Sequence, residues 1–171
     1  IYVNTNGNIT FNGPVSTYTP RAFPVASQPM IAPYWGDVDI RNHGGSCSTQ
    51  GVGVCTIPES NGVWWELDPV AGKGTFTGHE VGVYNCNNNH RMSFQLILSD
   101  PGGCSEAGDF DVEFRFNRCE WEYGSASGGT PAQSGFDAGD QINFVRLPMS
   151  MEPGIAAEMC SGTNVDEPGV W

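Results

Sequence analysis

The chain has 171 residues, with 19 acidic residues against 7 Lys and Arg, so its formal net charge is −12. A negative field repels phosphate groups, which argues against binding to nucleic acid and to anionic membranes. No apolar run approaches the length of a transmembrane helix, so we expect no membrane insertion. With 23 glycines, 12 prolines and no long helical pattern, the chain is expected to form one all-β domain with short strands and many turns.

The six cysteines predict disulfides and an oxidising, extracytoplasmic compartment, because their number is even and none forms a Cys-x-x-Cys pair. The first two bracket a short Gly-rich loop and would pair locally. If the central hairpin folds about Cys104, Cys86 and Cys119 come near register, which leaves Cys104 to pair with Cys160. The six positions are Cys47, Cys55, Cys86, Cys104, Cys119 and Cys160.

The N-terminal half begins with a predicted β-hairpin over residues 1–11. Asn6-Gly7 at its tip is the strongest short-range signal for a two-residue type I′ turn. Residues 13–24 contain three prolines and are expected to be an extended connection. A second hairpin is predicted over residues 62–77, because Asp68-Pro69 and Gly72-Lys73 are turn signals, and only one of its adjacent tryptophans can face inward.

The strongest pattern in the chain is a central hairpin formed by the alternating runs 92–99 and 109–117. In the second run the apolar residues share one face and the charged residues share the other, as in a half-buried strand. The linker between the runs is rich in Gly and Pro and reverses the chain. The apolar face is Phe110, Val112, Phe114 and Phe116. Beyond it we expect a flexible loop at 124–131, strands about 133–136 and 143–147, and one helical turn at 155–160.

Two segments, Asn4-Thr-Asn-Gly-Asn-Ile-Thr-Phe11 and Ile31-Ala-Pro-Tyr-Trp-Gly-Asp-Val-Asp-Ile-Arg41, resemble the nidogen-like extracellular domain (NIDO) family. Later blocks agree with the family in order, and the resemblance spans Tyr2 to Ser150. It implies a secreted or cell-surface domain over residues 1–171 that acts as a non-catalytic interaction or adhesion module for an extracellular protein or glycan. We expect the domain to lack the family's upstream strand, which would precede Ile1. We predict a disulfide-stabilised antiparallel β-sandwich-like domain with long loops and little helix.

Two positions depart from the family pattern. Gly78 stands where a tryptophan is common, and Val83 stands where an aromatic residue is common. The lost bulk predicts a shallow acidic recess between residues 42–56 and 78–89. The alternative is that neighbouring loops fill this space.

Asp37 and Asp39 are two residues apart, so in an extended strand their carboxylates lie on the same side and repel each other unless a cation lies between them. Calcium is the hard cation that carboxylates prefer, and we consider both residues as metal ligands. The alternative is that Arg41, two residues further on, neutralises the pair.

The histidines His43, His79 and His90 could form a transition-metal site with Glu80 if their loops converge, although isolated spacings are more typical of surface or structural histidines. Asp37, Asp39 and His79 would be the reactive groups of an alternative function, a small secreted metal-dependent enzyme or hydrolase. The candidates for contact with a ligand are Trp35, His43, His79, Glu80 and Tyr84.

Overall fold

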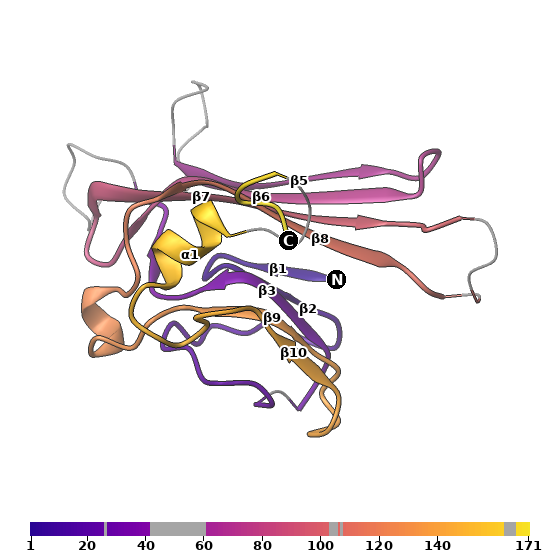
Figure 1. Cartoon of the computed structure of the whole chain (residues 1–171), viewed down its shortest axis with the longest axis horizontal. Coiled ribbons are helices and arrows are strands. Elements are labelled where there is room, and N and C mark those ends of the chain that lie inside the picture. Colours follow the sequence, from indigo (N-terminus) through magenta and orange to yellow (C-terminus); the bar gives the residue numbers. More distant parts are fainter. Residues whose placement is uncertain (26, 42–60, 103–105, 107, 163–166) are drawn as a thin grey trace.

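The computed structural model describes residues 1–25, 27–41, 61–102, 106, 108–162 and 167–171. Within them the fold is all-β, as predicted, and consists of two antiparallel sheets packed face to face (Figure 1). Sheet A contains, in spatial order, β1 (Tyr2–Asn4), β2 (Asn8–Thr10), β3 (Met30–Trp35), β9 (Gln133–Asp137) and β10 (Phe144–Arg146). Sheet B contains β4 (Val38–Asp39), β6 (Lys73–Val83), β7 (Asn87–Ser99) and β8 (Asp111–Cys119), and β5 (Gly62–Asp68) pairs with β6 on the same side as β4.

The core lies between the two sheets and is centred on Tyr34 of β3, which is fully buried. Its ring contacts Trp121 edge-on at 5.1 Å and stacks on Phe94 at 6.3 Å between ring centroids. Its hydroxyl donates a hydrogen bond of 2.6 Å to the carbonyl oxygen of Trp121. A buried tyrosine hydroxyl needs such a partner, and this one ties sheet A to the segment that follows β8.

The N-terminal hairpin is confirmed, but its turn has three residues rather than the predicted two. Asn4 pairs with Asn8, and the Gly7 amide donates to the Asn4 carbonyl at 3.2 Å. Gly7 has a φ of 79° and packs so closely against the Tyr34 backbone that a Cβ would lie 2.8 Å from its carbonyl carbon. The three-residue turn with a glycine of positive φ is the common alternative to the type I′ turn.

The central hairpin is confirmed as β7 and β8, with Leu98 opposite Val112 and Leu96 opposite Phe114. Near its base the register shifts between Ser93 and Phe94, because Asn117 is an extra residue on β8. Such a bulge re-aims the side chains beside it. The C-terminal tail closes the outer edge of β8, since the amides of Phe114 and Phe116 donate to the carbonyls of Trp171 and Gly169 at 3.0 and 2.8 Å.

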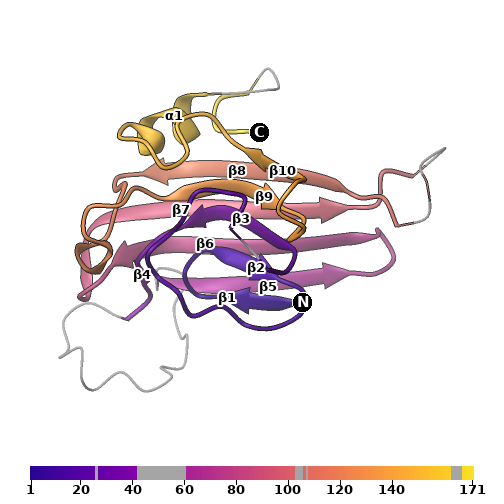
Figure 2. The ribbon, with the colours of Figure 1, turned by 90° about the horizontal axis from the view of Figure 1, so that it is seen from below.

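The predicted disulfide pairing is wrong for Cys119 and Cys160, which bond to each other. In the observed register Cys119 lies opposite Met92, whereas Cys86 lies six residues before Met92, in the turn between β6 and β7. Cys160 lies in α1 (Ile155–Ser161), the predicted helical turn, which packs beside β8 (Figure 2). Cys86 is disulfide-bonded as well, and the predicted Cys47–Cys55 pair lies outside the described residues.

The β5–β6 hairpin is confirmed, but neither of its tryptophans faces the core. Trp64 is 44% exposed and Trp65 is 64% exposed. The reason is visible in Figure 1: the strands of sheet B extend past sheet A on the side of the β5–β6 turn, so no second sheet covers this end. We call the part of sheet B formed by residues 64–76, 96–99 and 110–112 the projecting end.

Residues 13–24 form the predicted extended connection without a helix. The loop predicted at 124–131 contains a short 3-10 helix, η1 (Ser125–Ser127), that the sequence did not indicate. It is held by a hydrogen bond from the Ser127 hydroxyl to the Gly124 carbonyl at 2.9 Å. This short helix positions a backbone amide against one of the acidic candidates described next.

Candidate functional site

Asp37 lies in the connection between β3 and β4 and is 4% exposed. Its Oδ2 accepts the amide of Ala126, in η1, at 2.8 Å. Gly124 packs against it so closely that a Cβ at that position would stand 2.6 Å from the Asp37 Cγ. Burial raises the pKa of Asp37; the Ala126 amide opposes this rise, and the negative charge of Asp39 adds to it.

Asp39, in β4, is 5% exposed and accepts hydrogen bonds from three groups. These are the Arg41 Nε at 2.8 Å, the Arg41 amide at 2.9 Å and the Cys86 amide at 2.8 Å. Burial acts to raise the pKa of Asp39, but the Arg41 guanidinium and the two amides outweigh it and hold the pKa below its usual value. Arg41 therefore neutralises Asp39, as the alternative to a metal ion predicted. Calcium binding by Asp37 and Asp39 stays a prediction.

Among the candidates for contact with a ligand, Tyr84 has an accessible side chain and lies next to Arg41. It is 46% exposed, and the Arg41 guanidinium lies 5.5 Å from its ring centroid. Trp35, in contrast, is 3% exposed and donates its Nε1–H to the Thr17 carbonyl at 2.8 Å. Trp35 is therefore a core residue, and His43 lies outside the described residues.

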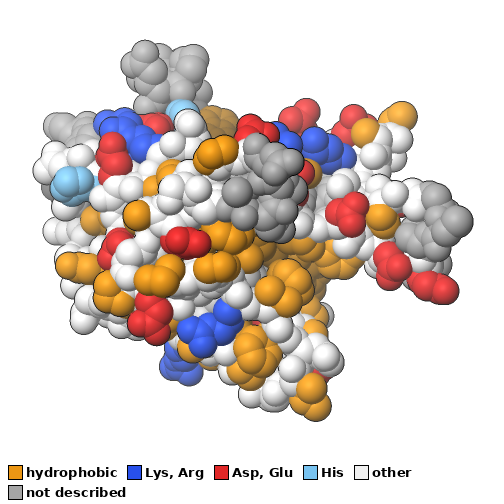
Figure 3. Space-filling model, in the orientation of Figure 1, with side chains coloured by type: hydrophobic (Ala, Val, Ile, Leu, Met, Phe, Trp, Pro, Cys, Tyr) orange, Lys and Arg blue, Asp and Glu red, His pale blue; other side chains and the backbone are white. Residues whose placement is uncertain are grey.

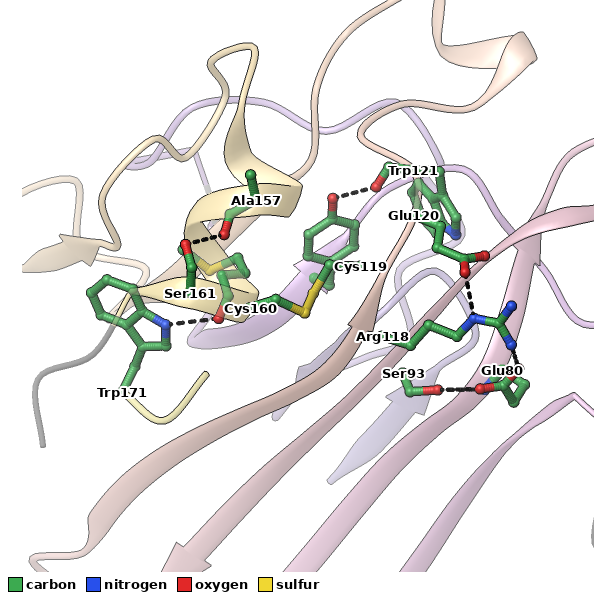
Figure 4. Close-up of a disulfide and its surroundings, with 12 residues drawn as sticks. Glu80, Ser93, Arg118, Cys119, Glu120, Trp121, Ala157, Cys160, Ser161 and Trp171 are labelled. Carbon is green, nitrogen blue, oxygen red and sulfur yellow. Dashed lines mark hydrogen bonds and ion pairs between the residues drawn. A yellow bond between two sulfur atoms is a disulfide. The ribbon is translucent and has the colours of Figure 1, made fainter. Parts of the chain in front are cut away.

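Glu80 lies in a bulge where β6 has two residues, His79 and Glu80, opposite Ser93 of β7. Its φ of 50° is left-handed, and the bulge turns its carboxylate toward Ser93 and Arg118. Figure 4 shows Arg118 between Glu80 and Glu120, while its neighbour Cys119 points to the other side of β8 and bonds to Cys160.

This outer-face charge cluster consists of two carboxylates and two guanidinium groups that share several hydrogen bonds. Glu80 accepts from the Ser93 hydroxyl at 3.1 Å and from Arg91 at 3.2 Å, and it also pairs with Arg118. Glu120 accepts from the Arg118 Nε at 2.8 Å and from the Arg91 amide at 2.9 Å. The cluster rigidly presents both charge signs on the outer face of sheet B.

The pKa values of the two carboxyl groups are lowered, although for different leading reasons. Burial acts to raise the pKa of Glu80, and the Ser93 hydroxyl, Arg91 and Arg118 together outweigh this effect. The pKa of Glu120 is lowered by Arg118 first and by the Arg91 amide second. Both groups are therefore anions at neutral pH, and their role is to hold the arginines in place.

The described residues do not bring His79, His90 and Glu80 together as a metal site, and His43 lies outside them. Within the described part of the chain, no three His, Cys, Asp or Glu side chains are arranged to hold a metal ion. His79 lines a shallow depression with Asn117 and Glu167, and His90 is exposed at the start of β7. One oxygen each of Asp39 and Asp37 accepts a backbone amide, and the enzymatic alternative that names these residues with His79 stays a prediction.

The inner side of Gly78 is filled by the Phe94 ring, since a Cβ on Gly78 would lie 2.6 Å from the Phe94 Cε1. Val83 is buried and pairs with Val38 of β4. The other wall of the predicted recess, residues 42–56, lies outside the described residues, so the recess and its alternative, that neighbouring loops fill the space, both stay predictions.

The sequence did not predict an apolar groove that lies where sheet B projects past sheet A. The groove has a volume of about 890 Å³, and Figure 3 shows hydrophobic side chains gathered in this recess. A second hollow, at the projecting end, adjoins the groove, and Phe11 and Phe110 line both. The signal available in the sequence was the group of apolar residues Ile142, Phe144 and Val145 next to a turn. We define the apolar groove by Phe11, Phe110, Val112, Phe136, Phe144 and Val145.

Comparison with known proteins identifies the family of this fold. A model described as the nidogen-like domain matches residues 1–54 and 75–171. The whole chain is 32% identical to alpha-tectorin of Gallus gallus, 32% to that of Mus musculus and 31% to that of Homo sapiens, and it spans 8% of the length of each. No solved structure matches. No helix of the described residues is long and apolar enough to cross a membrane. The chain therefore belongs to the nidogen-like domain family, and it is a secreted or cell-surface module.

Proposed function

We propose that this domain is a non-catalytic interaction and adhesion module that binds an extracellular protein through the projecting end of sheet B. The observation that carries the proposal is the exposure of Trp64 and Trp65 on β5, an edge strand that no second sheet covers in the described part of the chain. Tryptophan is among the residues that dominate binding energy at protein interfaces, because it offers a large, rigid contact area.

Successive side chains of a strand point to opposite faces, so this contact surface covers both faces of the β5–β6 hairpin. Trp65 lies opposite Phe76 and shares the inner face with Leu67, which is 58% exposed. Trp64 lies opposite Thr77 and belongs to the outer face. A partner that grips the hairpin end would therefore bury apolar surface on both of its sides, with the rest of the sandwich as a rigid support.

Binding of the purified domain to matrix deposited by cultured cells tests this proposal. The double variant Trp64→Ser/Trp65→Ser is expected to bind about tenfold or more weakly, because both anchors are lost. Tyr18→Ser is the matched control, since Tyr18 is an aromatic residue with 47% exposure outside sheet B. Equal binding of both variants would overturn the proposal. Binding that survives protease treatment of the matrix but not glycosidase treatment would assign the partner to the glycans instead.

A further inference from the structure

On the face of sheet A that packs against sheet B, a row of apolar residues continues beyond the part that sheet B covers. Ile9, Ile31, Phe136 and Val145 are in register across β2, β3, β9 and β10. Ile9 and Ile31 are 2% and 4% exposed, but Val145 is 42% exposed. The row thus emerges into the apolar groove, whose opposite wall is Phe110 and Val112 of sheet B.

The edge of sheet A at the same place is open. The Leu147 amide donates to Ser134 at 3.0 Å, and the Ala138 amide donates to Asn143 at 2.9 Å. Because main-chain groups alternate in direction along an antiparallel strand, those of Val145 face β9 and those of Phe144 and Arg146 face away from it. No described strand pairs with this side of β10. An open edge next to an apolar groove is the arrangement that binds an extended peptide as an added strand.

Charge defines what kind of peptide fits. Asp109 and Asp111 are exposed at the rim formed by β8, and Asp68 and Asp100 border the adjoining hollow. Among the described residues that line these two spaces, Lys73 is the single Lys or Arg. The net charge of the whole chain is −12. This charge attracts a basic ligand and repels a second copy of the same chain.

We propose that the open edge of β10 and the apolar groove together bind an extended segment of a partner protein in which apolar and basic residues alternate. The segment adds as a strand to sheet A beside Phe144 and Arg146. Its apolar side chains continue the row beyond Val145 and cover the groove, while its basic side chains lie on the opposite face of the added strand and are attracted by the negative net charge of the domain. This proposal rests on the proposed function and names the chemistry of one binding partner.

A synthetic ten-residue peptide of alternating valine and lysine, capped at both ends and labelled for fluorescence anisotropy, is the probe. It is expected to bind the intact domain, and its affinity is expected to fall as salt rises because the attraction of exposed charges is screened. The same peptide with glutamate in place of lysine is expected not to bind. Amide resonances of Phe144 and Arg146 are expected to shift on binding.

Two variants locate the site. Val145→Asp introduces a charge into the groove, and Ile142→Ser, at a 77% exposed residue that also lines the groove, is the milder variant should the first one not fold. Either is expected to weaken peptide binding about tenfold, as for loss of an interface anchor. Tyr18→Asp is the control, because Tyr18 is 47% exposed and lies outside both the apolar groove and the projecting end.

The proposal is overturned if the glutamate peptide binds equally well, if the groove variants bind as the control does, or if the peptide does not bind at all. Concentration-dependent dimerisation that Val145→Asp abolishes would assign the groove to a second copy instead. Loss of peptide binding in Val145→Asp with matrix binding retained would confirm the groove while separating it from the Trp64 and Trp65 contact. Matrix binding that needs the tryptophans, without any peptide binding, would reject the groove and keep the proposed function.

Discussion

The ring of Phe94 lies where a side chain on Gly78 would have to stand, with its Cε1 2.6 Å from the position of a Cβ. The two residues face each other across β6 and β7. Phe94 is 6% exposed and stacks on Tyr34, so it cannot turn away into solvent. The glycine is thus required by the packing of the core.

Gly78→Ala is expected to lower the free energy of unfolding by about 1–3 kcal/mol, the usual effect of adding bulk to a packed core. Urea denaturation measures the loss. Gly13→Ala is the matched control, because a Cβ at Gly13 has no other atom within 4 Å and leaves stability nearly unchanged. Equal stability of the two variants would mean that Phe94 has room to move. Gly78→Trp, which restores the aromatic residue common in the family, is expected to prevent folding.

The disulfide between Cys119 and Cys160 joins the end of β8 to α1 and closes a loop with a sequence separation of 41. The double variant Cys119→Ser/Cys160→Ser is expected to lose about 4 kcal/mol, the value that the loop length gives when the bond acts on the unfolded chain. Urea denaturation measures the difference, with Ser161→Ala as a control on the same helix. A loss below about 1 kcal/mol would show that packing of α1 on β8 already holds the two segments together.

We also expect all six cysteines to be oxidised. Titration of free thiols in the denatured, unreduced protein should find none. Two or more free thiols per chain would contradict the prediction.

Glu80 makes stability depend on pH. Because its pKa is lowered in the folded domain, it contributes stability above its unfolded pKa of about 4.3, and this contribution is lost as the pH falls through the lower folded value. Glu80→Gln is therefore expected to cost about 1 kcal/mol at pH 7 and less at acidic pH, since the two arginines that lose this carboxylate are partly exposed and Arg118 keeps its pair with Glu120. Thermal unfolding from pH 2 to pH 7 measures this trend. A difference that does not change with pH would reject the electrostatic explanation.

Local sequence patterns were enough to predict most of the strands, although not β3 and β4. The alternation in 109–117 predicted β8, and the turn signals around Asp68 predicted the β5–β6 hairpin. The pattern did not fix the register, because the extra residue Asn117 shifts the pairing where Cys119 lies. This is why the predicted Cys86–Cys119 pair was wrong.

The apolar groove could not be predicted, because it depends on how far one sheet extends past the other. Phe110 follows the alternation of a buried face, yet it is 52% exposed because sheet A does not cover that end of β8. The charge cluster likewise depends on two bulges on either side of Ser93. Such relationships join residues far apart in the chain and leave no periodic signal.

The spacing of Asp37 and Asp39 still predicts that calcium stabilises the folded domain. Millimolar calcium is expected to raise the melting temperature by binding the folded state, and Asp39→Asn is expected to remove the increment. Glu113→Gln, at a half-exposed carboxylate on β8, is the control. An unchanged melting curve across millimolar calcium would contradict calcium binding. The hydrogen bonds of Asp39 with Arg41 and of Asp37 with the Ala126 amide would then account for both carboxylates.

Tyr34 offers the sharpest test of the core, because its hydroxyl is buried and makes one defined hydrogen bond to the Trp121 carbonyl at 2.6 Å. Tyr34→Phe keeps the ring packing on Phe94 and Trp121 but leaves that carbonyl without this donor, so it is expected to cost about 1–3 kcal/mol. Tyr123→Phe, at a residue that is 54% exposed, is expected to change stability by less than about 0.5 kcal/mol.

Ionisation of the same tyrosine gives an independent measurement. Burial, aided by the negative charge of Glu122, raises the pKa of Tyr34 well above 10. In a spectrophotometric titration of the wild-type domain, one tyrosine is therefore expected to ionise only when alkali unfolds the protein, and this step is expected to vanish in Tyr34→Phe while Tyr123→Phe retains it. A late step that persists in Tyr34→Phe would contradict the burial of this hydroxyl and, with it, the close packing of the two sheets around β3.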